Sequence, residues 1–335
     1  MEGIKEIMKT SNMNISKDDA MQIPLVSICS IAYNHAPYIR QCLDGFLMQK
    51  TNFKYEIIIH DDASTDGTAE IIKEYAEKYP DLISPVFQKE NQYSKGLRGF
   101  YVRFLFPKAK GKYIALCDGD DYWTDPLKLQ KQVDFLEANP DFVMSTHGYN
   151  EYWEAQNKIS NIAQVSSKEI TLSTLIYCSW YFFQPLSLLF RSAAFNIGEY
   201  NKYACSRDTI LFYYLLTKGQ GFYFQEKMGI YRRHSNGIWT GSNRLQQWMS
   251  DYRVRMSIYE KEQSSDAVVF LVNLFYENIG RYWLIKNFKI IVYIYKAIKK
   301  HYGYVFALKC IIGRFIGLKN PHDETIKTIE AFHLD

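Results

Sequence analysis

Short apolar runs alternate with amphipathic segments along the first 150 residues of this chain, and this alternation restricts the possible folds most strongly. Each run has the length and β-branched content of a buried strand, and helical spacing of apolar residues follows most of them. Such alternation predicts a mostly parallel sheet flanked by helices, an α/β fold. The expected strands are Leu25–Ala32, Tyr55–Ile59, Ile83–Gln88, Tyr113–Cys117 and Phe142–Thr146.

The pattern is less regular from residue 151 to 240, and it is helical from about residue 244 onward. The elements expected in the less regular part are helices near 168–176 and Arg207–Thr217 and strands at Leu186–Arg191 and Gly221–Gln225. We therefore expect three parts, which are a polar lead over 1–22, an α/β domain over 23–240 and a helical C-terminal region over 241–335.

Composition excludes several classes of protein. Hydrophobic residues make up 47% of the 335 residues, which is too much for a disordered chain. The 40 Lys and Arg against 36 Asp and Glu are too balanced to indicate nucleic-acid binding. The six cysteines form no C-x-x-C pair, the N-terminus lacks the apolar core of a signal peptide, and no apolar stretch reaches the length of a membrane span. These features predict a cytoplasmic protein with reduced thiols.

Acidic clusters follow the second and fourth expected strands. Asp61 and Asp62 come after the second strand, and Asp118, Asp120 and Asp121 come after the fourth. Ligands of open α/β sheets bind beyond the carboxyl ends of the strands. Carboxylates packed at one edge are costly unless a cation is bound there, and Mg²⁺-type ions complete their shell with substrate phosphates. The clusters therefore indicate a nucleotide diphosphate held by a metal ion at Asp118 and Asp120.

Both clusters also have a structural interpretation. Asp, Ser and Thr are good helix caps and Asp66-Gly67 is a common turn pair, so Asp61 and Asp62 fit a capped turn. A single D-x-D is frequent in solvated loops. The joint placement of the clusters after two expected parallel strands favours the ligand site.

Three ordered segments resemble the family-2 glycosyltransferases of the GT-A fold. They cover about residues 24–150 and read VSICSIAYNHAPYIRQCLDGFLMQ, YEIIIHDDASTDGT and GKYIALCDGDDYWTDPLKLQKQVDFLEANP. The resemblance implies a nucleotide-sugar donor and a divalent ion, Mn²⁺ or Mg²⁺. The residues that it assigns to the donor and the ion are Tyr33 and Asn34 at the base, Asp61 and Asp62 at the base and ribose, Asp118 at the ribose and diphosphate, and Asp120 as metal ligand.

The resemblance also implies roles for residues in the second half of the chain. Asp208 occupies the position of the catalytic base, although Arg207 replaces the Glu that is common before it. Asp208 also fits an acid favoured by a helix macrodipole. The segment Tyr231–His234 resembles a Y-R-x-H motif, in which His234 is a metal ligand and Arg232 or Arg233 neutralises phosphate.

Two further matches to the family are partial. The loop after the third strand is matched loosely by Asn91 and by Arg98 or Arg103, and no arginine role follows. Residues 244–248 (RLQQW) partly match the Q-x-x-R-W of processive synthases, with Gln247 at the Arg position. Because no membrane span is expected, we interpret this segment as ordinary helix and the enzyme as adding one sugar at a time.

A basic segment lies near the C-terminus. Residues 281–319 contain nine Lys or Arg and no Asp or Glu, interleaved with aromatic and aliphatic residues. One interpretation is a helical region on an anionic membrane surface, at the inner face of the cell membrane. The other is a helical cap with a solvated basic face. A lipid-linked acceptor would give the basic face a purpose.

The expected function is metal-dependent, inverting transfer of a sugar from a nucleotide diphosphate to a glycan or lipid-linked acceptor in cell-surface glycan synthesis. UDP is the commonest nucleotide in such relatives. One alternative is a nucleotidyltransferase, but the segment Ala32–Pro37 lacks the Gly-rich phosphate loop of that class. The other alternative is a catalytically silent nucleotide-sugar-binding module, which has no need of Asp208.

Overall fold

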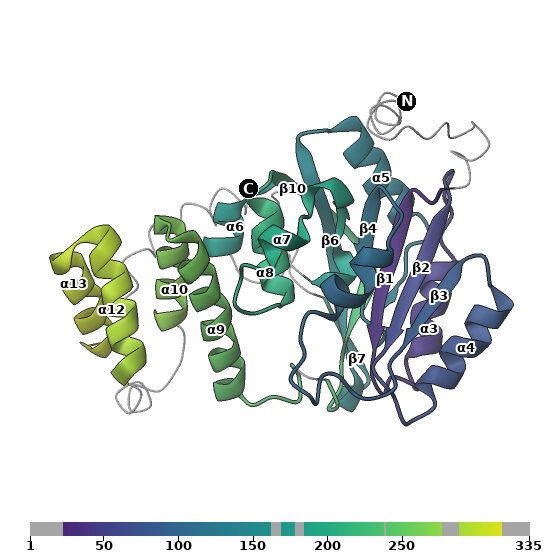
Figure 1. Cartoon of the computed structure of the whole chain (residues 1–335), viewed down its shortest axis with the longest axis horizontal. Helices are drawn as coiled ribbons and strands as arrows, with labels where there is room; N and C mark the ends of the chain where they lie inside the picture. The colour runs from purple at the N-terminus through teal and green to yellow at the C-terminus, as the bar shows by residue number, and fades with distance from the viewer. Residues whose placement is uncertain (1–22, 162–168, 178–183, 238, 277–287, 317–335) are drawn as a thin grey trace.

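The computed structural model describes residues 23–161, 169–177, 184–237, 239–276 and 288–316. Its described strands form one sheet in the order β3-β2-β1-β4-β9-β6-β10-β5, with β7 paired to β6 and β8 to β10 (Figure 1). The strands are β1 (Val26–Ala32), β2 (Tyr55–Asp61), β3 (Ile83–Phe87), β4 (Tyr113–Leu116), β5 (Tyr122–Trp123), β6 (Phe142–Trp153), β7 (Lys158–Asn161), β8 (Glu169–Ile170), β9 (Leu189–Arg191) and β10 (Gln220–Arg233).

Helices cover both faces of this sheet, as the alternating sequence pattern predicts. The α-helices are α3 (Ile39–Leu47), α4 (Thr68–Lys78), α5 (Lys128–Ala138), α6 (Leu172–Tyr177), α7 (Ile197–Tyr200), α8 (Asp208–Leu216), α9 (Arg244–Glu262), α10 (Ser265–Tyr276), α12 (Phe288–Tyr302) and α13 (Tyr304–Ile316). The short helices are a π-helix, η1 (Tyr101–Leu105), and the 3₁₀ turns η2 (Phe106–Lys108), η3 (Glu154–Gln156), η5 (Pro185–Ser187) and η6 (Ser192–Ala194).

The two faces of the sheet build two separate cores. Alternate residues of a strand point to opposite faces, so Ile57 and Ile59 pack with α3, α4 and α5, whereas Ile58 packs in the cluster of η1, α8, α9 and α10. Helix α8 is buried along its whole length after Asp208. The second core therefore fixes the start of α8 relative to the sheet.

The parallel half of the sheet matches the sequence-based expectation, and the other half is mixed. Strands β3, β2, β1 and β4 are parallel, whereas β9 is antiparallel to both β4 and β6. Strands β6 and β10 pair in parallel and are longer than expected, because their polar second halves continue the ladder past irregularities near Phe224 and Lys227. This extension carries Arg232 and Arg233 to the edge where the acidic loops lie.

The C-terminal helices extend away from the sheet. Helix α9 begins with a capping box, in which Asn243 and Gln246 each accept the other's backbone N–H. It packs on α8 and α10, and α12 and α13 follow at the end of the molecule opposite α4 (Figure 1). Among the described residues, no helix combines the length and the apolar character that a bilayer crossing requires.

Candidate active site

A cavity of about 1170 Å³ lies at the carboxyl ends of β1, β2 and β4. Backbone hydrogen bonds align the loops that border it: Asp62 N donates to Ala32 O at 3.0 Å and Gly119 N donates to Ile31 O at 2.8 Å. The acids after β2 and β4 are thereby brought to one edge, as the sequence predicts. The end of β10, the start of α8 and one face of α9 form further parts of the wall.

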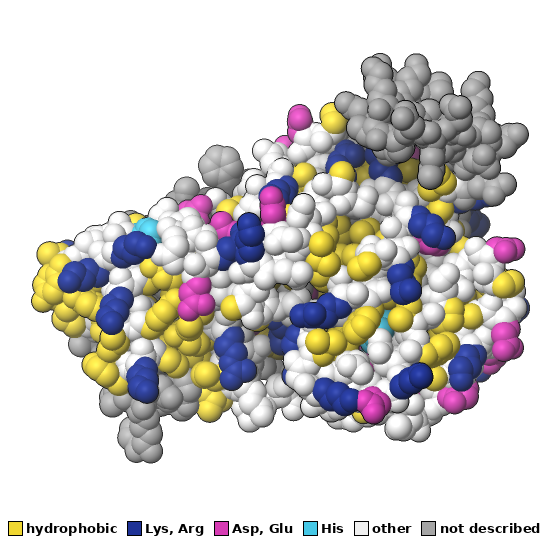
Figure 2. Space-filling model, in the orientation of Figure 1, with side chains coloured by type: hydrophobic (Ala, Val, Ile, Leu, Met, Phe, Trp, Pro, Cys, Tyr) yellow, Lys and Arg dark blue, Asp and Glu magenta, His cyan; other side chains and the backbone are white. Residues whose placement is uncertain are grey.

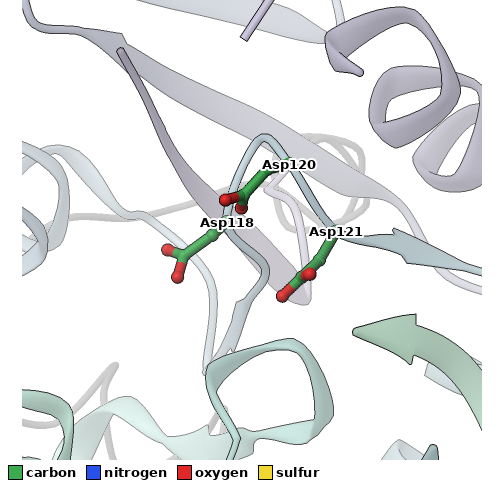
Figure 3. Close-up of side chains that lie close together, drawn as sticks. All are labelled: Asp118, Asp120 and Asp121. Atoms are coloured by element: carbon green, nitrogen blue, oxygen red, sulfur yellow. The ribbon is translucent and has the colours of Figure 1, made fainter. Parts of the chain in front are cut away.

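Three carboxylates cluster in the loop after β4. Oxygens of Asp118, Asp120 and Asp121 all lie within 4.8 Å of one another. Figure 3 shows the three side chains on this loop, with the carboxylate of Asp121 set apart from those of Asp118 and Asp120. Asp121 does not line the cavity, and its carboxylate accepts the backbone N–H of Arg232 at 2.8 Å. Asp118 and Asp120 are therefore the two that can hold a cation facing the cavity.

Burial and neighbouring charges change the pKa values of these carboxylates. Burial, with the neighbouring charge of Asp120, raises the pKa of Asp118 to about 7, although Tyr101 donates a hydrogen bond to it at 2.5 Å. Burial opposes the charge of Asp120 as well, but His35 and His234 hold the pKa of Asp120 below its usual value. Asp121 has its pKa raised well above the usual value by burial.

Two imidazoles face Asp120. His234 Nε2 lies 3.0 Å and His35 Nε2 lies 3.7 Å from Asp120 Oδ2. The Nδ1 atoms of both rings are buried without a hydrogen-bond partner among the described residues. His234 was predicted at this place and His35 was not. The signal for His35 is its position in the turn after the first strand, which ends at the same edge as the acidic loops.

This donor set fits a divalent ion. Two carboxylates and one imidazole offer the oxygen and nitrogen ligands that Mn²⁺ takes, and Mg²⁺ is held by one or two carboxylates with substrate phosphates. Asp118 and Asp120 would hold the ion, with the imidazole of His234 beside Asp120 as a further donor. A cation there would relieve the repulsion that raises the pKa of Asp118.

Each arginine of the Tyr231–His234 segment bonds to other residues of the protein. Arg232 donates from Nε to Asp120 O at 2.8 Å and from a terminal nitrogen to Gln41 at 2.7 Å. Arg233 pairs with Glu151. Both line the cavity, and Arg232 also holds the loop of Asp120 in place.

The predicted nucleotide-binding residues divide into two groups. Tyr33, with 44% of its surface exposed, and Asp62 line the cavity, whereas Asn34 and Asp61 do not. The side chains of Asn34 and Asp61 accept backbone N–H groups of Thr65 and Ser64 and so shape the loop after β2.

Asp62 has both carboxylate oxygens in use. They accept the backbone N–H groups of Gln92 at 2.8 Å and Tyr93 at 3.0 Å. Asp62 thereby holds the segment after β3 against the cavity, where Tyr93 and Arg98 form part of the wall.

Asp208 is the first residue of α8 and lies on the wall formed by α8 and α9. Its side chain is 44% exposed, and Oδ1 accepts the backbone N–H of Thr209 at 2.9 Å. Its charge contributes to the raised pKa of Asp118, so the two carboxylates share one electrostatic environment. Sequence reasoning missed that α9 borders the same space, where Gln247, Trp248 and Asp251 line it.

The glycosyl transferase family 2 model matches residues 27–199, just over half of the chain. The chain belongs to glycosyl transferase family 2. The match confirms the resemblance seen in the sequence and extends it beyond residue 150.

Relatives of known sequence agree with this membership. An uncharacterized protein of Mycobacterium tuberculosis is 38% identical over 217 residues, which are 64% of this chain and 60% of that protein. The chain thus spans less than two thirds of that relative's length. The Escherichia coli protein named UDP-Glc:alpha-D-GlcNAc-diphosphoundecaprenol beta-1,3-glucosyltransferase WfaP is 33% identical over 156 residues, 46% of this chain and 57% of WfaP.

Solved structures share the fold of this family 2 member. S. aureus TarS 1-349 in complex with UDP-GlcNAc superimposes with a TM-score of 0.59 at 14% identity, covering 82% of this chain and 81% of TarS. The complex of TarS 1-349 with UDP gives a TM-score of 0.58 at 15% identity, covering 87% and 88%. The expected GT-A architecture with a helical C-terminal region is confirmed.

Proposed function

We propose that this protein is a metal-dependent, inverting glycosyltransferase that moves one sugar from a nucleotide diphosphate to an acceptor hydroxyl in cell-surface glycan synthesis. The observation that carries the proposal is the convergence of Asp118, Asp120, His234 and Asp208 on one cavity. A cation site and a partly exposed carboxylate on one cavity are what a sugar diphosphate and an attacking hydroxyl require.

UDP is the proposed nucleotide. The names of two similar proteins support it, because WfaP is named for UDP-Glc and TarS is described with UDP-GlcNAc. The name of WfaP also includes a lipid diphosphate acceptor, which supports a lipid-linked acceptor here. Tyr33 and Asp62 are the cavity residues proposed for the nucleotide, with Asn34 and Asp61 shaping their loops.

Metal binding and proton acceptance are assigned to different residues of the cavity lining. Asp118, Asp120 and His234 would bind the divalent ion, which supplies positive charge against the leaving diphosphate. Asp208 accepts the proton of the acceptor hydroxyl as that oxygen attacks the anomeric carbon from the face opposite the diphosphate. The attack inverts the anomeric configuration. Arg232 keeps the Asp120 loop in place during the transfer.

Nucleotide-sugar turnover tests the proposal. The full chain is incubated with UDP-glucose, UDP-GlcNAc and other nucleotide sugars, with Mn²⁺, Mg²⁺ or EDTA, and release of the nucleotide is measured with and without lipid-linked acceptors. Metal-dependent release that an acceptor accelerates supports the proposal. Tight binding of a nucleotide sugar without release, with or without acceptors, shows a silent binding module and contradicts it.

The helical region over 241–335 is proposed to lie on the inner face of the cell membrane. Of the basic segment 281–319, the structure describes 288–316, where α12 and α13 expose Phe288 and Val305 at 64% and 66%. Figure 2 shows basic (Lys or Arg) and hydrophobic side chains next to one another over the end of the molecule that α12 and α13 form. An amphipathic surface of this kind suits anionic lipid, and α9 of the same region borders the cavity.

A further inference from the structure

Five arginines line the cavity, and three of them have donors committed within the protein. Arg98 donates to the backbone carbonyls of Tyr93 and Leu97, and Arg232 and Arg233 bind the partners described above. The guanidinium groups of Arg207 and Arg244 donate no hydrogen bond to any residue that the structure describes. Their N–H groups are therefore available to a ligand, although Arg207 Nε also lies at ion-pair distance from Asp208.

Arg207 and Arg244 belong to one continuous wall. The guanidinium carbon of Arg207 lies 5.7 Å from the centre of the Trp239 ring. Gln247 in turn donates to the backbone carbonyl of Trp239 at 2.9 Å. Arg244 precedes Gln247 by one helical turn on α9, so both side chains are on the face that borders the cavity. We call Arg207, Trp239, Arg244 and Gln247 the arginine wall.

The arginine wall lies beside the proposed base. Arg207 Nε is 4.0 Å from Asp208 Oδ1, and both side chains line the cavity. An anion bound at Arg207 would therefore lie next to the proposed base.

We propose that Arg207 and Arg244 form an anion subsite that binds a phosphate or diphosphate group of the acceptor. This proposal rests on the proposed function, because it assigns the side of the cavity that carries Asp208 to the acceptor. The donor's own phosphates belong with the cation at Asp118 and Asp120. The cavity of about 1170 Å³ exceeds the usual volume of a single small-molecule site, roughly 300–1,000 Å³.

Binding of simple anions tests the subsite without knowledge of the acceptor. Methylenediphosphonate is titrated into the full chain calorimetrically at fixed free Mn²⁺, with and without saturating UDP. Decyl diphosphate and the neutral decyl maltoside are titrated in the same way. The variants are R207Q, R244Q and the double variant, with R253Q as a matched control, because Arg253 is exposed on α9 and does not line the cavity. Melting temperatures verify that each variant folds.

The subsite predicts that methylenediphosphonate binds in the presence of UDP and that the double variant weakens this binding at least tenfold, whereas R253Q leaves it unchanged. Tighter binding of decyl diphosphate, with no binding of decyl maltoside, identifies a lipid headgroup as the source of the anion. Equal binding of both diphosphates shows that the subsite recognises the phosphate group without its lipid.

Displacement of methylenediphosphonate by UDP, or binding that is equal in wild type and the double variant, overturns the subsite. Failure of the proposed function is separable from this result. It would appear as an absence of UDP binding and of nucleotide-sugar turnover in wild type, whatever the arginine variants do.

Discussion

The protonation of Asp118 makes cation binding depend on pH. Burial and the charge of Asp120 raise its pKa to about 7, so below pH 7 a proton occupies the carboxylate that a cation needs. Above pH 7 the carboxylate is free. We predict that Mn²⁺ affinity, measured by calorimetry, falls as pH falls through 7, by roughly tenfold per pH unit for one displaced proton.

Y101F provides the matching variant. The hydroxyl of Tyr101 donates to Asp118 and favours its charged form, so its removal raises the pKa further and moves the pH midpoint of Mn²⁺ binding upward. An affinity that does not change with pH, in either protein, contradicts this account of Asp118.

Asp208 supplies a second prediction at this scale. D208N keeps the shape of the side chain and removes its capacity to accept a proton. Turnover is expected to fall by about 10²–10⁴, while UDP affinity changes little. D134N, on the exposed face of α5, is the control for loss of one negative charge. Turnover that survives in D208N assigns the base to another residue.

Sequence reasoning found the residues of the candidate site that carry a motif. Asp118, Asp120 and His234 come together as expected, because the ends of parallel strands meet at one edge. His35 and Tyr101 were missed because their contacts with Asp120 and Asp118 arise from the approach of loops distant in the chain, which no local pattern records.

At the scale of the elements, helices α12 and α13 are proposed to bind a membrane surface. Lys289, Lys296 and Lys300 are exposed on α12, beside the exposed Phe288. Each basic residue near an anionic surface contributes about 1 kcal/mol of attraction. We predict that wild type floats with vesicles that contain phosphatidylserine, and that K289E/K296E/K300E stays in the soluble fraction.

A matched charge change elsewhere controls this experiment. K50E/K73E/K78E alters three exposed lysines in the N-terminal half and should float like wild type. If the α12 variant floats as well as wild type, or if wild type does not float, the membrane proposal is contradicted. Helices α12 and α13 are then a helical cap with a solvated basic face.

The full length of strands β6 and β10 could not be predicted from the sequence. Their apolar first halves were expected, at Phe142–Thr146 and Gly221–Gln225. Their second halves contain polar residues such as Asn150 and Glu151, which resemble loop sequence. These residues extend the strands because the two segments pair with each other in parallel, a long-range contact that propensity does not register.

A buried lysine makes the stability of the whole molecule depend on pH. Lys128 is fully buried, its Nζ has no hydrogen-bond partner among the described residues, and it lies 3.7 Å from the centre of the Trp123 ring. Burial lowers the pKa of Lys128 to about 7. An unfolded lysine keeps its proton to about pH 10.4, so the unfolded state binds more protons between pH 7 and that value. Stability contributed through this group therefore rises with pH across that window.

K128M removes the ammonium and keeps most of the volume. We predict that it raises stability by at least about 1 kcal/mol at pH 7, or about 2–4 °C in Tm, and that the difference shrinks toward pH 10. Thermal unfolding at several pH values measures this, with K73M on exposed α4 as the control. A K128M protein that is less stable than wild type at pH 7 contradicts the cost assigned to this charge.

The molecule as a whole is proposed to bind an activated sugar through a cation that the loop after β4 holds. Calorimetric titration of UDP into wild type and D120A, with Mn²⁺ and with EDTA, tests this most directly. The account predicts that wild type binds UDP with Mn²⁺ at least about 100-fold more tightly than with EDTA, and that D120A loses this dependence while its melting temperature stays near that of wild type. UDP binding that is equal with Mn²⁺ and EDTA, or retained in full by D120A, would contradict it.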